Sequence, residues 1–392
     1  MPSLRILADE NIPCVENAFG EFGSVERYAG RDLRSAQLQG ADVLLVRSVT
    51  PVGPALLEES SVRFVGSATI GTDHVDREYL AEQDIAFAHA PASNADSVAD
   101  YVVAALLTLA RIRNVMLRER TVGVVGCGNV GSRVARRLSA LGLSVLRNDP
   151  PLAADAEAAG RPHDFVSLAT VLRRADIVTL HVPLTIDGPY PTHHLIGGEA
   201  LSKMKPGAWL LNTSRGSVVD GNALLNALED GRVAATGLDV WEGEPSPDPA
   251  LVRAVDLATP HVAGYAFDGK VRGTAMLHDA LCEFLNVDAS WNPQGELQPD
   301  DPDTLRCHPP DPHLPRTEWL YHLARQAYDL AADDARMRRI LEHPPHERGD
   351  HFSRLRASYP VRREMQQHVL RRAGVPSADE EAVADGLTMQ YR

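Results

Sequence analysis

Three polar segments stand out because each follows directly on an apolar, strand-like run. They place Arg215, Glu244 and His261 just after those runs. In an open parallel sheet the carboxyl ends of the strands face the ligand crevice, so side chains delivered there can converge on one substrate. These three residues therefore form a candidate catalytic set.

The set fits the oxidation of a secondary alcohol that lies beside a carboxylate. This oxidation removes a hydride and a proton, and a histidine titrates in the range needed to take the proton. His261 is the candidate base, and a carboxylate on its other ring nitrogen would fix the tautomer and stabilise the imidazolium. Arg215 offers a planar pair of donors suited to a substrate carboxylate. Together they predict a 2-hydroxyacid site.

Each residue taken alone also has a purely structural explanation. A single arginine is often a surface ion-pair partner, a single glutamate an exposed loop charge, and a single histidine a hydrogen-bonded core residue. The occurrence of all three at strand ends favours the active site. Glu242 competes with Glu244 for the carboxylate role, and spacing alone leaves both open.

A glycine-rich loop predicts a dinucleotide site. Gly126, Gly128 and Gly131 form a G-x-G-x-x-G pattern after the strand-like run Thr121–Val125 and before a helical pattern. The first glycine permits a tight turn, the second lets the backbone approach a pyrophosphate, and the third allows close packing of helix on strand. The N–H groups and dipole of the helix would then hold the phosphates. A glycine turn that binds no nucleotide is the weaker alternative.

Asp149 predicts which dinucleotide is bound. It follows the next strand-like run, about 20 residues beyond the glycines, where a carboxylate can accept hydrogen bonds from the ribose hydroxyls. A negative charge there disfavours the extra phosphate of NADP, so we expect NAD. Arg147 keeps NADP open as a minor possibility.

The elements that carry these residues alternate between strands and helices. Strands are expected at residues 5–8, 43–46, 64–66 and 85–88, and again at 121–125, 144–146, 177–180, 209–212 and 234–238. Helices are expected at 97–112 and 266–285. The pattern predicts an α/β protein with a flavodoxin-like substrate domain and a doubly wound parallel-sheet (Rossmann) NAD domain.

Three domains follow from this pattern. We expect a discontinuous substrate domain over 1–93 and 267–290, the NAD domain over 94–266, and a C-terminal module over 291–392 that begins in a linker rich in Pro and Asp.

Composition narrows the class of partner. The formal net charge of -14 argues against general nucleic-acid binding, and no apolar run has the length of a membrane span. The first residues lead directly into a strand pattern, so we expect no secretory signal and a cytoplasmic protein. The four cysteines form no C-x-x-C pair, so we expect reduced thiols and no metal site.

The ordered segments resemble the D-isomer-specific 2-hydroxyacid dehydrogenases over about residues 4 to 287. The resemblance rests on the glycine loop and on D-I-V-T-L-H-V-P-L-T, N-T-S-R-G, L-D-V-W-E-G-E-P and T-P-H-V-A-G. It implies Arg215, Glu244 and His261 as catalytic residues, and so Glu244 rather than Glu242. The implied cofactor contacts are Gly126, Gly128, Asn129, Val130, Gly131, Asp149, Val182, Thr213, Ser214, Asp239 and Gly264.

Further stretches resemble the branch of this family that acts on 4-phospho-D-erythronate in pyridoxal 5'-phosphate biosynthesis. They include the segments around Ser48, Thr69 and Tyr265, which this resemblance implies as substrate contacts, and 352–364 near the C-terminus. In that branch the C-terminal module is a small α+β dimerisation domain, so a homodimer is expected. Arg47, beside Ser48, is a candidate for the substrate phosphate or equally a structural ion pair.

Two other functions remain open at this stage. One is a phosphoglycerate or hydroxypyruvate type of dehydrogenase, and the other is a non-enzymatic NAD(H)-sensing regulator. The presence of Arg215, Glu244 and His261 argues against the regulator.

Overall fold

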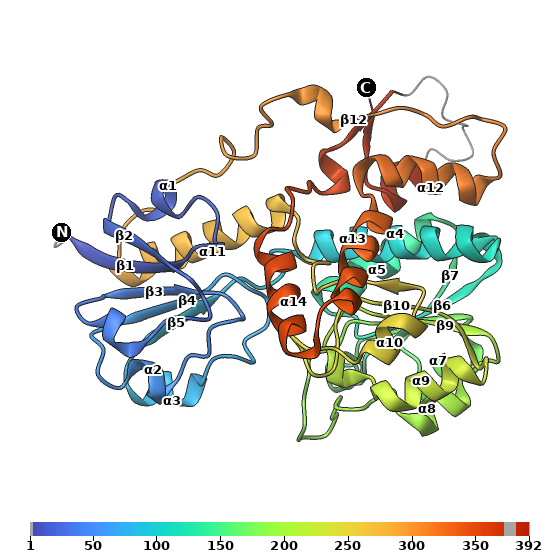
Figure 1. Cartoon of the computed structure of the whole chain (residues 1–392), viewed down its shortest axis with the longest axis horizontal. Coiled ribbons are helices and arrows are strands. Elements are labelled where there is room, and N and C mark those ends of the chain that lie inside the picture. Colours follow the sequence, from blue (N-terminus) through green and yellow to red (C-terminus); the bar gives the residue numbers. More distant parts are fainter. Residues whose placement is uncertain (1–2, 372–381, 392) are drawn as a thin grey trace. The chain divides into compact units, whose positions relative to one another are not determined.

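The computed structural model describes residues 3–371 and 382–391, and the chain divides into two compact units. One unit comprises Met1–Asn94 with Tyr265–Pro302, and the other comprises Ala95–Gly264 with Asp303–Arg392 (Figure 1). We refer to them as the N-terminal unit and the NAD unit. Residues 372–381 and 392, which belong to the predicted C-terminal module, lie outside the described residues.

The N-terminal unit contains a parallel sheet of five strands in the order β2-β1-β3-β4-β5. This is the flavodoxin-like order predicted for the substrate domain. The strands are β1 (Leu4–Asp9), β2 (Gly23–Tyr28), β3 (Val43–Val46), β4 (Phe64–Ser67) and β5 (Ala86–His89). Strand β2 was not predicted from the sequence, because this edge strand is polar and mostly exposed and lacks the apolar run of the central strands.

Helices cover the sheet of the N-terminal unit. Among them α11 (Phe267–Leu285) brings the chain back to this unit, and its buried Leu277 and Leu281 pack in one core with Ile6 and Phe64. The shorter helices are α1 (Val15–Phe19), α2 (Pro54–Leu57) and α3 (Arg77–Glu82).

The NAD unit contains a parallel sheet in the order β11-β10-β9-β8-β6-β7. Strand β6 lies between β7 and β8, so the direction of winding reverses there, and in sheets of this kind ligands bind beside that point, at the carboxyl ends of the strands. The strands are β6 (Thr121–Val125), β7 (Ser144–Asn148), β8 (Ile177–Leu180), β9 (Ala208–Asn212), β10 (Val233–Leu238) and β11 (Leu257–Ala258). The predicted Rossmann fold is confirmed; the two-residue β11 was missed because of its length.

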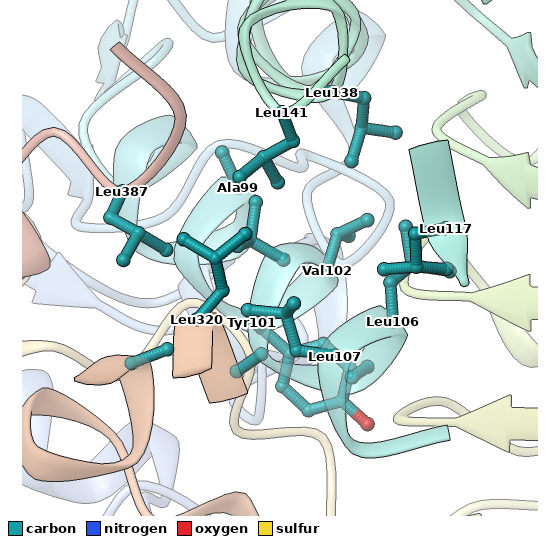
Figure 2. Packing of buried hydrophobic residues seen from close by; sticks show 14 of the residues in the cluster. Ala99, Tyr101, Val102, Leu106, Leu107, Leu117, Leu138, Leu141, Leu320 and Leu387 are labelled. Atoms are coloured by element: carbon teal, nitrogen blue, oxygen red, sulfur yellow. The ribbon is translucent and has the colours of Figure 1, made fainter. Parts of the chain in front are cut away.

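Helix α4 (Ala95–Arg113) forms the centre of the larger core in the NAD unit. It is apolar on nearly all sides, which indicates a helix buried all round. Figure 2 shows Leu106 and Leu107 of α4 among leucines of other elements, with Leu320 and Leu387 contributed by the C-terminal part of the chain. The other helices before residue 264 are α5 (Asn129–Ala140), α6 (Pro150–Ala158), α7 (Leu168–Arg174), α8 (Gly198–Lys203), α9 (Gly221–Glu229) and α10 (Pro249–Ala254).

The C-terminal part of the chain mixes helices with a small sheet, as the predicted α+β module requires. The helices are α12 (Arg316–Ala327), α13 (Leu330–Arg338) and α14 (Arg348–Ala357). The strands β12 (Arg306–Cys307), β13 (Val369–Leu370) and β14 (Gln390–Tyr391) pair in parallel. This part packs within the NAD unit, since buried Trp319 and Leu323 belong to the same core as α4. Its role in dimerisation stays a prediction.

Within the described residues, no helix combines the length and the apolar character needed to cross a membrane.

Candidate active site

His261 and Glu244 form a hydrogen-bonded pair. Nδ1 of His261 lies 2.8 Å from Oε2 of Glu244, and Oε1 of Glu244 accepts the backbone N–H of Trp241 at 2.8 Å. The side chains are 29% and 22% exposed, so the pair is partly buried. Burial raises the pKa of Glu244, but the charges of His261 and Arg356 and the two hydrogen bonds outweigh it, and the pKa lies below its ordinary value of 4.5. Glu244 is therefore an ionised partner for the ring.

Glu242, the competing carboxylate, has a different partner. Its Oε1 lies 2.7 Å from Nε2 of His194, and its Oε2 accepts the N–H of Gly221 at 3.3 Å. The geometry thus assigns Glu244, and not Glu242, to His261. Spacing alone could not separate the two because they are only two residues apart.

The backbone of His261 is strained and held by Asp239. Its φ of 57° lies in the left-handed region, which costs energy for a residue with a side chain. The carbonyl of Asp239 accepts the N–H of His261 at 2.7 Å, and its carboxylate accepts the N–H groups of Val262 and Ala263 at 2.8 and 2.9 Å. Burial raises the pKa of Asp239. Asp239 therefore fixes the His261 loop, and its predicted contact with the cofactor stays a prediction.

Arg215 lies in a tight turn after β9. Oδ1 of Asn212 accepts the N–H and the hydroxyl of Ser214, and Nδ2 of Asn212 donates to the carbonyl of Arg215 at 2.9 Å. A Cβ on Gly216 would lie 2.0 Å from the carbonyl carbon of Trp241. Glycine therefore lets the Arg215 turn pack directly on the backbone of the turn that carries Glu244.

The glycine loop has the geometry expected of a dinucleotide site. Gly126 has a φ of 84°, and a Cβ on Gly131 would lie 1.8 Å from the carbonyl oxygen of Gly126, so both positions require glycine for internal reasons. A Cβ on Gly128 would meet no described atom within 4 Å. Gly128 is the N-cap of α5, whose first turn carries no acidic residue. These residues fit NAD, since they leave room at Gly128 for a pyrophosphate at the start of a long helix.

Asp149 supports the loop directly. Its Oδ2 accepts the N–H of Cys127 at 2.7 Å, and its Oδ1 accepts the N–H of Leu152 at 3.1 Å, so it also caps α6. An ionised carboxylate has further lone pairs for ribose hydroxyls. Arg147, which left NADP open, pairs with Asp164 and lies over the Phe165 ring, with Cζ 5.4 Å from the ring centroid.

The other predicted cofactor residues lie at the same edge of the sheet. Val182 follows β8, and its Cγ1 would be 2.9 Å from a Cβ on Gly126. Thr213 follows β9, and its hydroxyl lies 3.2 Å from Nδ1 of His181. The remaining ones are Asn129 and Val130 in the first turn of α5, Ser214 in the Arg215 turn, and Gly264 after the His261 loop.

The predicted substrate residues lie in the N-terminal unit. Nη2 of Arg47 donates to the hydroxyl of Tyr265 at 2.5 Å, and its Nη1 lies 3.8 Å from Oδ1 of the buried Asp9. Thr69 follows β4, and its hydroxyl donates to the carbonyl of Gly71 at 3.1 Å. Ser48 is exposed. Arg47 and Tyr265 are therefore brought together in the N-terminal unit.

Lys270 also lies beside Tyr265, and it was not among the residues predicted for the site. Its Nζ lies 4.4 Å from the centroid of the Tyr265 ring. The chain has only three lysines, and the other two, Lys203 and Lys205, form ion pairs with Glu199 and Asp176. The rarity of lysine in the sequence could have drawn attention to Lys270.

Metal ligands were not expected from the sequence. Among the described residues, one group, formed by His193, His194 and Glu242, has ligand atoms within 4.8 Å of one another. Two of its members already bond to each other, as described above. All four cysteines are free thiols, as expected.

Comparison with known proteins identifies the family. Residues 85–263 match the family model described as "D-isomer specific 2-hydroxyacid dehydrogenase, NAD binding domain". The chain is 63% identical over 390 residues to an erythronate-4-phosphate dehydrogenase of Salinibacter ruber, with all of both chains covered. The chain belongs to the erythronate-4-phosphate dehydrogenase family. A Pseudomonas putida member of this family is 47% identical and covers 95% of this chain and 96% of its own.

Solved structures agree with this family. A D-lactate dehydrogenase from Aquifex aeolicus, complexed with NAD and lactic acid, superposes with a TM-score of 0.61 at 28% identity, over 72% of this chain and 95% of its own. Residues 313–385 match a second model, which describes a domain of unknown function. As a member of the erythronate-4-phosphate dehydrogenase family, the chain is an NAD-dependent oxidoreductase, and the resemblance inferred from the sequence is confirmed.

Proposed function

We propose that the chain oxidises 4-phospho-D-erythronate to 3-hydroxy-2-oxo-4-phosphooxybutanoate with NAD, as a step of pyridoxal 5'-phosphate biosynthesis. The observation that carries the proposal is the bond of 2.8 Å between His261 and Glu244, with Glu244 held in turn by the N–H of Trp241. This arrangement leaves Nε2 of His261 to take a proton from a substrate hydroxyl.

The roles of the three catalytic candidates follow from their chemistry. Nε2 of His261 takes the hydroxyl proton, and Glu244 keeps the other ring proton on Nδ1 and stabilises the imidazolium. Arg215 binds the substrate carboxylate through two parallel N–H donors. Bound NAD supplies the acceptor for the hydride, and the residues proposed to hold it are those of the glycine loop with Asp149.

The phosphate of the substrate requires a second cationic site. We assign it to Arg47 and Lys270, both of which lie against the Tyr265 ring, with Cζ of Arg47 5.5 Å and Nζ of Lys270 4.4 Å from its centroid. Ser48 and Thr69 are the proposed neutral contacts. Removing a charge-assisted hydrogen bond costs about 1.5–3 kcal/mol. Arg47→Ala and Lys270→Ala should therefore each raise KM for the phosphorylated acid about tenfold or more.

The matched measurement separates this role from a structural one. KM for unphosphorylated erythronate should change much less in both variants than KM for the phosphorylated acid. Lys203→Ala, which removes only a surface pair with Glu199, is the control and should leave both constants unchanged. Equal effects of Arg47→Ala on the two substrates would show that Arg47 serves as a structural ion pair with Asp9.

The proposed substrate is tested against its nearest competitors. Purified protein with NAD should give a higher kcat/KM with 4-phospho-D-erythronate than with 3-phosphoglycerate or glycerate. A preference for 3-phosphoglycerate would assign the chain to the phosphoglycerate type. Binding of NAD without turnover of any hydroxyacid would favour an NAD(H)-sensing regulator.

We further propose a cytoplasmic homodimer that forms through the C-terminal part of the chain. Light scattering with size-exclusion chromatography should give twice the mass of 42.6 kDa. A monomeric mass at micromolar concentration would contradict the dimer.

A further inference from the structure

A buried arginine in the C-terminal part of the chain reaches the loop that carries His261. Arg362 is 7% exposed, and its Nη2 donates to the carbonyl of Ala263 at 2.8 Å and lies 3.5 Å from that of Val262. These two residues directly follow His261. Their N–H groups bind the carboxylate of Asp239, so the loop is held by Asp239 through its N–H groups and by Arg362 through its carbonyls.

Arg362 is itself fixed by a rigid aromatic group. Its Cζ lies 4.0 Å from the centroid of the Tyr328 ring, and the hydroxyls of Tyr328 and Tyr359 both bond to Oδ2 of buried Asp333, at 2.9 and 2.7 Å. Burial alone would lower the pKa of Arg362, but Tyr328, Tyr359 and nearby carboxylates raise it by a larger amount. The net pKa lies above its ordinary value, so the guanidinium stays charged. Among the described residues, its Nε and Nη1 have no hydrogen-bond partner.

Burying a charge with most of its donors unused is costly. An apolar residue would cover the Tyr328 ring without that cost, so packing alone does not account for an arginine here. In the part of the chain that the structure describes, its one short hydrogen bond is to the His261 loop, and the left-handed backbone of His261 needs neighbouring groups to stabilise it.

The chain segment that follows Arg362 is anchored to α4. Oε1 of Glu364 accepts the hydroxyl of Ser97 at 2.6 Å, and the N–H of Met365 donates to Oδ2 of Asp100 at 2.9 Å. Both partners lie in α4, the central buried helix. Through Arg362, the His261 loop is therefore connected to the core around α4.

The same C-terminal part also lies against the turn that carries Glu244. A Cβ on Gly349, in α14, would be 3.4 Å from Cγ of Pro245. Arg356 lies two turns further along α14 and contributes to the low pKa of Glu244. Both members of the catalytic pair are thus supported from outside the dinucleotide fold.

We propose that Arg362 is a positioning residue for His261, through which the C-terminal part of the chain takes a direct share in catalysis. This inference rests on the proposed function, in which His261 is the base. It predicts that Arg362→Met lowers kcat by about 10- to 100-fold, because a small displacement of a catalytic group has effects of this size. The Kd for NAD should change less than about threefold, because the substitution does not touch the glycine loop.

Arg338 offers a matched control. It is also an arginine of the C-terminal part that donates to backbone carbonyls of the NAD unit, those of Val252 and Val255 at 3.0 and 2.9 Å, but these do not lie in the His261 loop. Arg338→Met should lower stability while leaving kcat within about twofold of the unchanged protein.

The decisive readout is hydrogen exchange in the full-length protein with NAD bound. In Arg362→Met, the peptide that contains His261, Val262 and Ala263 should exchange about tenfold faster, whereas in Arg338→Met only the peptide around Val252 should. Arg362→Lys keeps one donor and the charge, so it should recover part of both kcat and protection. Normal protection of the His261 peptide in Arg362→Met would overturn the proposal.

Two further outcomes are distinguishable. If Arg362→Met does not fold, Arg362→Lys decides, since normal exchange and normal kcat in that variant would overturn the proposal. If the unchanged protein does not oxidise 4-phospho-D-erythronate, the proposed function fails, while the exchange of the His261 peptide still tests whether Arg362 holds the loop.

Discussion

Replacing Glu244 by glutamine should invert the tautomer of His261. Oε1 of Glu244 accepts the N–H of Trp241, so the amide oxygen of glutamine must occupy that position. The amide NH₂ then faces Nδ1 of His261, which lies 2.8 Å from Oε2 in the unchanged protein. Because the NH₂ group only donates, Nδ1 must accept, and the ring proton moves to Nε2. Nε2 can then no longer take a proton from the substrate.

The size of the effect follows from the loss of the base. In a serine protease the analogous change, which also imposes the wrong tautomer, lowers kcat by about 10⁴-fold. We expect a loss of about 10³- to 10⁴-fold in kcat, equivalent to about 4–5.5 kcal/mol in the barrier. The melting temperature should change little, since the shape of the side chain and its bond to Trp241 are kept.

The assay is the initial rate of NADH formation with saturating NAD and substrate. Glu242→Gln is the matched control, because this carboxylate lies two residues away and pairs with His194. It should retain activity within a few-fold, given the small contribution of exposed pairs. A Glu244→Gln variant as active as Glu242→Gln would refute the assignment of Glu244 and the tautomer argument with it.

Three further predictions concern the cofactor loop and its surroundings. Gly128→Ala should keep the melting temperature but raise the Kd for NAD about tenfold or more. Gly131→Ala should raise this Kd and also destabilise the fold by about 1–3 kcal/mol, because its Cβ clashes with the preceding turn. Fluorescence titration measures the Kd and thermal unfolding measures the stability of each variant. Asp149→Ala should raise the ratio of kcat/KM for NADP to that for NAD about tenfold or more. It should also lower the free energy of unfolding by about 1 kcal/mol, because α6 loses its N-cap. An unchanged ratio would contradict the role of Asp149 at the ribose. Burial lowers the pKa of His181 from 6.5 to about 3, so the unfolded chain binds the proton more tightly than the folded chain. The free energy of unfolding should therefore fall as the pH drops from 6.5 towards 3. In urea unfolding, His181→Asn should lose less of this free energy over the same pH range than the unchanged protein.

The sequence predicted the elements that bury apolar runs, and missed those that do not. Strands β6 and β8 were predicted with their full bounds because both are four- or five-residue apolar runs in the centre of a parallel sheet. The polar edge strand β2 has no such run, and neither has the short β13 of the C-terminal part. Edge strands and two-residue strands form through tertiary pairing, which local pattern does not encode.

The candidate site shows the same division. Residue types at strand ends were enough to nominate Arg215 and His261, because the chemistry of each type is characteristic. The pairing of Glu244 with His261 required the resemblance or the structure, since Glu242 is equally acidic and equally near. Arg362 lies about 100 residues beyond His261 in the sequence, and its bond to the loop depends on the packing of the C-terminal part around Tyr328.

The most direct test of the account is NADH formation from NAD and 4-phospho-D-erythronate by the unchanged protein and by His261→Ala. Each is measured with and without an added 2-oxoacid, which would reoxidise cofactor that stays bound. We expect turnover by the unchanged protein and a loss of about 10³-fold or more in His261→Ala, with the Kd for NAD preserved. Equal rates for the two proteins, or no turnover under either condition despite bound NAD, would contradict it.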